Sequence, residues 1–384
     1  MQKKKIMIVG AGLTGAVIGR KLAEAGYPVT IVESRPYVAG NCYTERDRET
    51  GVMVHVHGPH IFHTDDEAVW KFANDFADFV PYELRVKATT GGRVYSLPIN
   101  LLTINQFFGT THAPEEARKF IESRVVQSQQ APVTFEDQAL QFLGKELYEG
   151  FFKGYPIKQW GLHPNKLPAS VLKRLPVRFN YDDNYFAHKY QGIPRDGYTS
   201  LVANILDHEL IDVRLNENFL RSDAARFDHV FYSGPLDGWF DYEYGRLGYR
   251  TLRFERSVHD NDFQGCAVMS YPEEKFPFTR ISEHKHFTPW EKFEKTVVFK
   301  EYSSQAREGD VLYYPIRLAE EQRLLKKYLE KAKHEKDVSF VGRLGTYRYL
   351  DMDVTIAEAL KCASSFLDNE SQNEPIPQFF VDPN

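Results

Sequence analysis

Three glycines near the start of the chain have the spacing of a dinucleotide-binding loop. Gly10, Gly12 and Gly15 form a G-x-G-x-x-G motif directly after the apolar run 6–9, and Glu33 ends the next apolar run. In such a loop the first glycine makes a tight turn, the second lets the backbone approach a pyrophosphate, and the third lets the following helix pack closely. The acid accepts from ribose hydroxyls. A bare glycine triplet can be an ordinary turn, but with strand, helix and acid in place it predicts dinucleotide binding.

Later residues favour FAD over NAD. Gly40 and Asn41 follow the acid at the place where many FAD proteins extend their pyrophosphate site. Near the other end of the chain, Arg343 offers a cation for pyrophosphate. Asp351 and Met352 precede a helix whose N-terminus would stabilise an anionic reduced flavin. Taken alone, Arg343 could be a surface turn residue and Asp351 a helix cap.

Four histidines between residues 55 and 63 first suggest a metal site. His55 and His57 would share one face of a strand, but Gly58 and Pro59 break it before His60 and His63. No nearby carboxylate or thiolate completes a familiar ligand set. We therefore expect no metal.

Two arginines are candidates for binding a diphosphate. Arg174 and Arg280 carry guanidinium groups that are always charged and can hold phosphate oxygens through two N–H groups. Such a group can also stabilise the charge that a departing phosphate gains. Each arginine taken singly is more often a surface ion-pair residue.

The elements that would position these residues form an α/β protein. A strand–helix–strand pattern opens the chain, and a strand at 338–341 followed by a helix with its apolar face at 356–367 closes it. We expect an FAD-binding, Rossmann-like, doubly wound domain with an inserted α-helical bundle and an antiparallel β-sheet domain. The expected ranges are 1–85, 205–240 and 320–384 for the FAD-binding domain, 100–175 for the helical insertion, and 86–99, 176–204 and 241–319 for the sheet domain that binds substrate. Residues 228–233 should return to the first domain as a strand, and the polar tail after Asp368 should fray.

Composition excludes several classes of protein. The net charge of -5 gives no basic field for nucleic acid or an anionic membrane. No apolar run is long enough for a membrane span or a signal peptide. Cys42, Cys266 and Cys362 are widely spaced, which argues against a disulfide framework. We expect a cytoplasmic protein with reduced thiols that binds neither nucleic acid nor membrane.

Beyond these motifs, the chain resembles bacterial UDP-galactopyranose mutases over nearly its whole length. The resemblance is carried by Val54–Thr64, Leu97–Asn100, Gly144–Tyr148, Lys158–Gly161, Arg174–Phe179, Asp183–Phe186, Tyr313–Pro315 and Gly342–Tyr349. It implies the same three-part architecture, FAD as cofactor and a homodimer.

The resemblance also implies roles for individual residues. The implied catalytic residues are Arg174, Arg280, His63, Tyr349 and Asp351. The implied contacts to the UDP-sugar are Phe151, Phe152, Tyr155, Trp160, Arg174, Tyr185, Ser270, Arg280, Tyr314 and Tyr349. The implied contacts to FAD are Gly10, Gly12, Leu13, Thr14, Gly15, Glu33, Ser34, Gly40, Asn41, His60, Ile61, Phe219, Arg343, Tyr349, Asp351 and Met352. Without the resemblance, Phe151 and Tyr155 could simply be core residues one helical turn apart, and His60 and His63 packed structural histidines.

The reaction that the resemblance implies is a redox-neutral ring contraction. UDP-galactopyranose and UDP-galactofuranose are interconverted, which supplies galactofuranose for cell-surface polysaccharide. The anomeric bond to UDP must break and the sugar 4-hydroxyl must then attack the same carbon, so a covalent carrier is needed. N5 of reduced FAD would attack that carbon and displace UDP, with NAD(P)H or another reductant as the electron source.

Two other functions share parts of this pattern. An FAD-dependent oxidoreductase of the amine-oxidase type would explain the glycine motif, and a non-catalytic nucleotide-sugar binder would explain the phosphate-binding residues. Three positions also depart from the usual family pattern. Ala39 replaces a glycine and is expected to matter little, whereas Pro156 replaces a threonine and Ser270 an asparagine close to the nucleotide.

Overall fold

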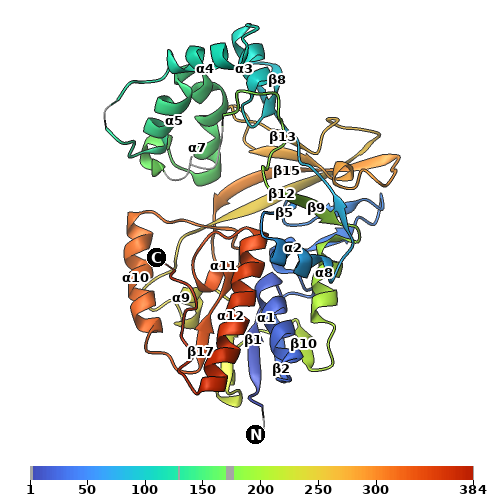
Figure 1. The fold of residues 1–384 in the computed structure, drawn as a ribbon, viewed down its shortest axis with the longest axis vertical. Helices are drawn as coiled ribbons and strands as arrows, with labels where there is room; N and C mark the ends of the chain where they lie inside the picture. The colour runs from blue at the N-terminus through green and yellow to red at the C-terminus, as the bar shows by residue number, and fades with distance from the viewer. Residues whose placement is uncertain (1–2, 129, 170–176, 384) are drawn as a thin grey trace.

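The computed structural model describes residues 3–128, 130–169 and 177–383. Figure 1 shows a bundle of short helices at one end, long strands in the middle and a helix-covered sheet at the other end. The strands are β1 Ile6–Val9, β2 Val29–Glu33, β3 Thr44–Arg46, β4 Met53–His55, β5 Phe62–Thr64, β6 Phe79–Pro81, β7 Val86–Thr90, β8 Arg93–Leu97, β9 Tyr190–Pro194, β10 Ile211–Leu215, β11 His229–Tyr232, β12 Tyr249–Asp260, β13 Val268–Ser270, β14 Arg280–Glu283, β15 Lys295–Gln305, β16 Tyr314–Pro315 and β17 Val338–Phe340. The α-helices are α1 Leu13–Glu24, α2 Glu67–Asn74, α3 Leu101–Phe108, α4 Pro114–Glu122, α5 Phe135–Leu143, α6 Lys145–Leu147, α7 Gly154–Trp160, α8 Gly197–Leu206, α9 Leu236–Trp239, α10 Ala319–Ala332, α11 Gly342–Gly345 and α12 Met352–Gln372.

A five-stranded parallel sheet forms the dinucleotide-binding part of the molecule. Its order is β10-β2-β1-β11-β17, so β1 lies at the centre between β2 and β11. The short Val- and Ile-rich strands are buried, as expected for a parallel sheet covered by helices. The predicted Rossmann-like class is confirmed, and so is the return of 228–233 to this sheet as β11.

Helix α8 packs in the core of this domain, although its residues were expected to belong mainly to the antiparallel sheet domain. The apolar face of α8, with Tyr198, Leu201 and Ile205, packs in the same cluster as α1 and α12. The sequence pattern assigned residues up to 204 to the antiparallel sheet. Helical periodicity shows that a face is apolar but not which sheet covers it.

The seven-stranded sheet has the order β16-β12-β15-β14-β13-β7-β8 and is antiparallel except for the β13–β7 pair. Helices α3 to α7 form their own apolar cluster, which includes residues of β7 and β8, and α7 also packs against β15. This arrangement agrees with the predicted helical bundle and antiparallel sheet.

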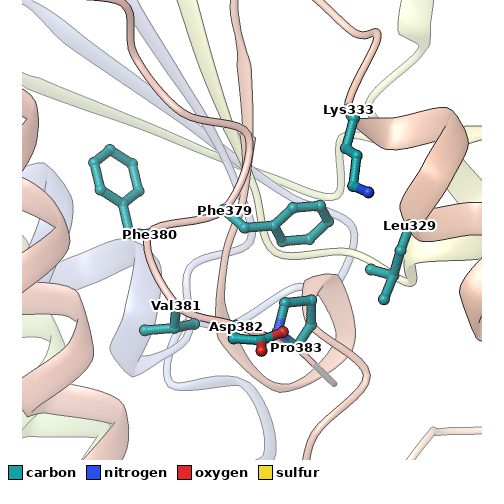
Figure 2. Close-up of a pocket in the computed structure, with 7 residues that line it drawn as sticks. All are labelled: Leu329, Lys333, Phe379, Phe380, Val381, Asp382 and Pro383. Carbon is teal, nitrogen blue, oxygen red and sulfur yellow. The ribbon is translucent and has the colours of Figure 1, made fainter.

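The C-terminal tail is ordered by contacts to β17, so the prediction that it frays was wrong. Phe340 N donates to Gln378 O at 2.8 Å, and the ring of Phe379 stacks on that of Phe340 at 5.3 Å. The tail thus covers the edge strand of the parallel sheet. With α10 it lines a pocket of about 340 Å³, and Figure 2 shows the Phe379 ring pointing toward Leu329 and Lys333. None of the predicted site residues lines this pocket.

Among the described residues, no helix combines the length and apolar character that crossing a bilayer requires.

Buried His229 should make stability depend on pH. Its ring lies in the core beside Phe231, and burial lowers its pKa to about 3. The unfolded chain binds this proton near pH 6.5, so stability falls as the pH drops below 6.5 towards 3. Between pH 7 and 4.5, protonation of His229 should lower the free energy of unfolding of the wild-type protein by about 2 kcal/mol. His229→Gln, which can still bond Ser339, should not show this part of the loss. Denaturant unfolding at both pH values tests this, with exposed His334→Gln as the control. Equal pH slopes in both variants would contradict it.

Candidate active site

The glycine loop joins β1 to α1 with the backbone that a dinucleotide needs. Gly10 has φ +101°, and a Cβ on Gly15 would lie 2.0 Å from Gly10 O, so both positions require glycine. Gly12 faces Gly40, whose Cβ would lie 3.4 Å from the Gly12 Cα. Two glycine backbones therefore border one gap beside the start of α1, where a pyrophosphate can approach N–H groups. Leu13 and Thr14 form the first turn of this helix.

Glu33 ends β2 beside this loop. Its carboxylate is buried and accepts from Ala11 N at 3.0 Å and Arg35 N at 3.0 Å, while Ser34 Oγ donates to it at 3.3 Å. The bonds hold the acid in place, and lone pairs remain for ribose hydroxyls. Phe219 packs in the neighbouring apolar cluster, with its ring stacked on Trp239 at 5.8 Å.

Arg343 belongs to α11, and its hydrogen bonding tests whether the site fits an anionic cofactor. Its Nη2 donates to Tyr313 O at 2.7 Å, and the guanidinium lies 4.8 Å from the ring centre of Tyr349. Its buried Nε finds no hydrogen-bond partner among the described residues. A buried donor of this kind needs an acceptor. The Gly12–Gly40 gap, Glu33 and this arginine fit a bound dinucleotide.

Ala39 precedes Gly40 and has a backbone conformation that favours glycine. It is buried and has φ +77°, the left-handed region in which a Cβ costs about 1 kcal/mol. The expectation that replacing glycine here matters little was wrong for the backbone. Asn41 follows in the same turn and accepts from Arg35 while donating to Leu312 O.

Three histidines of the 55–63 segment, His55, His57 and His60, hydrogen-bond to protein groups. His57 lies between the phenols of Tyr37 and Tyr313, each at 2.9 Å. His60 Nδ1 bonds to Gly58 O at 2.7 Å, and burial lowers the pKa of His60 to about 4. These rings are neutral at pH 7 and serve as packed, hydrogen-bonded groups. Ile61 is buried beside them.

His63 connects this loop to the predicted sugar side of the site. Its ring stacks on Phe186 at 3.8 Å, and Phe186 meets Tyr185 edge-on at 5.1 Å. Burial and neighbouring His188 lower the pKa of His63, while Asp351 opposes the shift. Asp351 is the N-cap residue of α12, but its side chain makes no capping bond. The structure thus brings His63 and Asp351 into the same region.

One row of side chains crosses the antiparallel sheet at the site. Strand register places Ser270 opposite Arg280 and Arg280 opposite Glu301, so all three lie on one face. Arg280 Nε donates to Glu301 Oε2 at 2.7 Å, and Nη2 forms an ion pair with the same oxygen at 2.7 Å. Burial opposes the charge of Arg280, but the Glu301 carboxylate outweighs it and raises the guanidinium pKa. The side chain of Arg280 is 26% exposed.

Aromatic side chains surround Arg280. Trp160 meets Tyr314 at 6.4 Å, and Tyr314 stacks on Tyr349 at 5.8 Å. Burial raises the pKa values of Tyr155, Tyr185 and Tyr314, with Arg280 acting in the opposite direction in each case. The three phenols therefore keep their protons at neutral pH and can donate to anionic oxygens.

Some predicted residues do not join this cluster as expected. The ring of Phe151 is buried in the helical core, with its centre 5.3 Å from those of both Tyr95 and Phe107. Phe152 belongs to the same core. Pro156 lies in the first turn of α7, where a missing N–H is tolerated. Arg174 lies outside the described residues.

Glu301 is a site residue that the sequence pattern did not reveal. It is buried in β15, and its other oxygen accepts from Thr279 Oγ1 at 2.9 Å. Lys300 and Ser303 lie close to it in the sequence, so no apolar pattern singled out this acid.

We expect Glu301→Gln to lower kcat/KM by about thirty-fold, because a neutral amide orients Arg280 less firmly than a carboxylate. Protein folding should be retained, since Thr279 can still bond the amide oxygen. Steady-state kinetics on the reduced protein tests this. Exposed Glu255→Gln, on the neighbouring strand, is the control; equal activity in both variants would show that Glu301 does not position Arg280.

Comparisons with known proteins bear on the whole chain. The profile of the family described as UDP-galactopyranose mutase matches residues 150–349, and that of an NAD(P)-binding Rossmann-like domain matches residues 8–76. The chain is 59% identical over 381 residues to a protein described as probable UDP-galactopyranose mutase from Klebsiella pneumoniae, with 99% of each covered. It is 52% identical over 375 residues to dTDP-fucopyranose mutase from Escherichia coli, covering 96% of this chain and 100% of that one. A crystal structure of reduced UDP-galactopyranose mutase has the same fold, with a TM-score of 0.72 at 15% identity and 99% of both chains covered.

The fold and the site define a protein with a flavin-type dinucleotide-binding domain beside a cluster of tyrosines around Arg280. The similarities over the full length of the chain identify the family within this class. The chain belongs to the UDP-galactopyranose mutase family, as the sequence resemblance predicted.

Proposed function

We propose that this protein is an FAD-dependent mutase that interconverts UDP-galactopyranose and UDP-galactofuranose without net oxidation. The observation that carries the proposal is Arg280, a charged and partly open guanidinium that Glu301 holds among protonated phenols. A guanidinium with phenol donors suits a diphosphate leaving group. A flavin oxidase acting on an amine has no need of this arrangement.

The chain's own residues would divide the work between binding and charge stabilisation. Arg280 would hold the diphosphate and stabilise the charge that UDP gains as the anomeric bond breaks. Tyr185, Tyr314 and Tyr349 would donate to the same oxygens, and Arg174 is proposed as the second cation. Tyr155 and Trp160 would bind the nucleotide base and the sugar side.

Gly12, Gly40, Glu33 and Arg343 would hold FAD. When bound and reduced, the flavin supplies the nucleophile that the ring contraction requires. NAD(P)H or another reductant would provide its electrons. His63 and Asp351 would exclude water beside the sugar and orient its hydroxyls.

Turnover with and without reductant tests the proposal. Purified protein should convert UDP-galactofuranose to UDP-galactopyranose after dithionite reduction and far more slowly when oxidised. Neither an oxidase nor a non-catalytic binder predicts this result. Formation of an oxidised sugar, or binding without conversion, would reject the mutase function.

A second nucleotide sugar belongs in the same assay. The dTDP-fucopyranose mutase of Escherichia coli is 52% identical to this chain, and the UDP-galactopyranose mutase relative 59%. The higher identity favours UDP-galactose. If kcat/KM were larger for dTDP-fucopyranose than for UDP-galactopyranose, the substrate would be reassigned but the reaction type would stay the same.

We also propose that the protein acts in the cytoplasm as a homodimer. Cys42, Cys266 and Cys362 are free thiols, which suits a reducing compartment. Light scattering of the purified protein tests the dimer.

A further inference from the structure

Helix α7 carries Tyr155 and Trp160, and its one lysine, Lys158, contacts the sheet domain. The Lys158 ammonium donates to three backbone carbonyls of the connection between β13 and β14. These are Tyr271 O, Glu273 O at 3.0 Å and Phe278 O at 3.0 Å. An ammonium has three donors, so this cage uses all of them. Among the described residues no carboxylate lies within ion-pair distance of Lys158.

The same helix is pressed against the same connection at a second point. A Cβ on Gly154 would lie 2.2 Å from Pro272 O. Glycine alone therefore allows this approach of the two backbones. The helix is further tied to the sheet by Ser303 Oγ, which donates to Gln159 O at 2.8 Å.

The connection continues directly into the anion-binding row. Tyr271 N donates to Thr279 O, which closes the base of the connection, and Thr279 Oγ1 donates to Glu301. Glu301 in turn holds Arg280. A continuous set of hydrogen bonds thus runs from Lys158 to Arg280.

We propose that Lys158 is a positioning residue that holds α7 on the 271–279 connection, so that Tyr155 and Arg280 bind the UDP moiety as one rigid unit. The inference rests on the proposed function only for the identity of the ligand. Lys158 need not touch the ligand. Its effect is to fix the separation between Tyr155 on the helical insertion and Arg280 on the sheet, because misplacement of either side chain weakens binding of UDP.

Lys158→Met tests this role because methionine keeps the apolar stem but has no donor. We expect the Kd of UDP, and KM for the nucleotide sugar, to rise about ten-fold while kcat at saturation changes less than about three-fold. Flavin content should be unchanged. Lys145→Met is the matched control, since Lys145 lies in the same insertion with an exposed side chain. Titration calorimetry with UDP gives a readout independent of turnover.

Gly154→Ala disturbs the same contact without removing a charge. It should raise the Kd of UDP similarly, and the double variant should be less than additive because both changes break one interface. A flavin-loaded Lys158→Met protein that binds UDP within about two-fold of the Lys145→Met control would overturn the proposal. So would loss of flavin and fold in both variants, because that result assigns Lys158 to general stability. Wild-type protein that fails to bind UDP would instead reject the proposed function.

Discussion

Replacing Arg280 by alanine should lower kcat/KM about a thousand-fold. The change removes a charged donor from the place where the leaving group gains negative charge. It also leaves Glu301, 3% exposed on its side chain, without its counter-ion in the sheet. Both effects act most strongly at the transition state, so kcat should fall as well as KM rise. Steady-state kinetics on reduced protein and UDP titration of oxidised protein measure the two contributions.

Arg253→Ala is the matched control for Arg280→Ala. Arg253 is an exposed arginine of β12 whose guanidinium lies over the Tyr302 ring at 4.1 Å. It neighbours Phe254, which register places opposite Glu301, so it points to the other face of the sheet. Its loss should change kcat/KM by less than about three-fold. If both variants lost activity equally, Arg280 would have no special role in the reaction.

Gly12→Ala should yield a folded protein that retains less than about a tenth of the normal flavin. Gly12 has φ -79°, which alanine accepts, and its Cβ would meet only the Gly40 Cα at 3.9 Å. The protein itself therefore tolerates the methyl group. The added group fills the gap that a pyrophosphate needs in order to approach the start of α1. Absorbance near 450 nm relative to protein measures flavin retention, and circular dichroism measures folding.

Gly238→Ala is the corresponding control in the same part of the molecule. A Cβ there would meet the hydroxyl ends of the Tyr242 and Tyr232 side chains at 3.3 and 3.4 Å, and Pro235 Cβ at an ordinary contact distance of 3.7 Å. Flavin content should stay at the wild-type ratio. Full flavin occupancy in Gly12→Ala would show that the dinucleotide does not bind at this loop.

Local residue order was sufficient to predict the dinucleotide loop. Gly10, Gly12 and Gly15 act within one strand–turn–helix unit, and Glu33 ends the next strand, so neighbouring residues decide their geometry. The same holds for the Rossmann-like class, because burial on both faces of a parallel strand leaves an apolar run in the sequence. The family resemblance supplied Arg280 and the tyrosines as candidates but not their arrangement.

Only the tertiary structure decided which residues meet at the site. Ser270, Arg280 and Glu301 lie on three consecutive strands and share a face because those strands pair in one register. Register depends on the packing of the whole sheet, which no local pattern encodes. Phe151 turned inward and the tail covered β17 for the same reason: the partners of an apolar side chain are chosen by the fold. The sequence by itself determined the cofactor loop and the family, whereas long-range packing determined how Arg280 is held and what surrounds it.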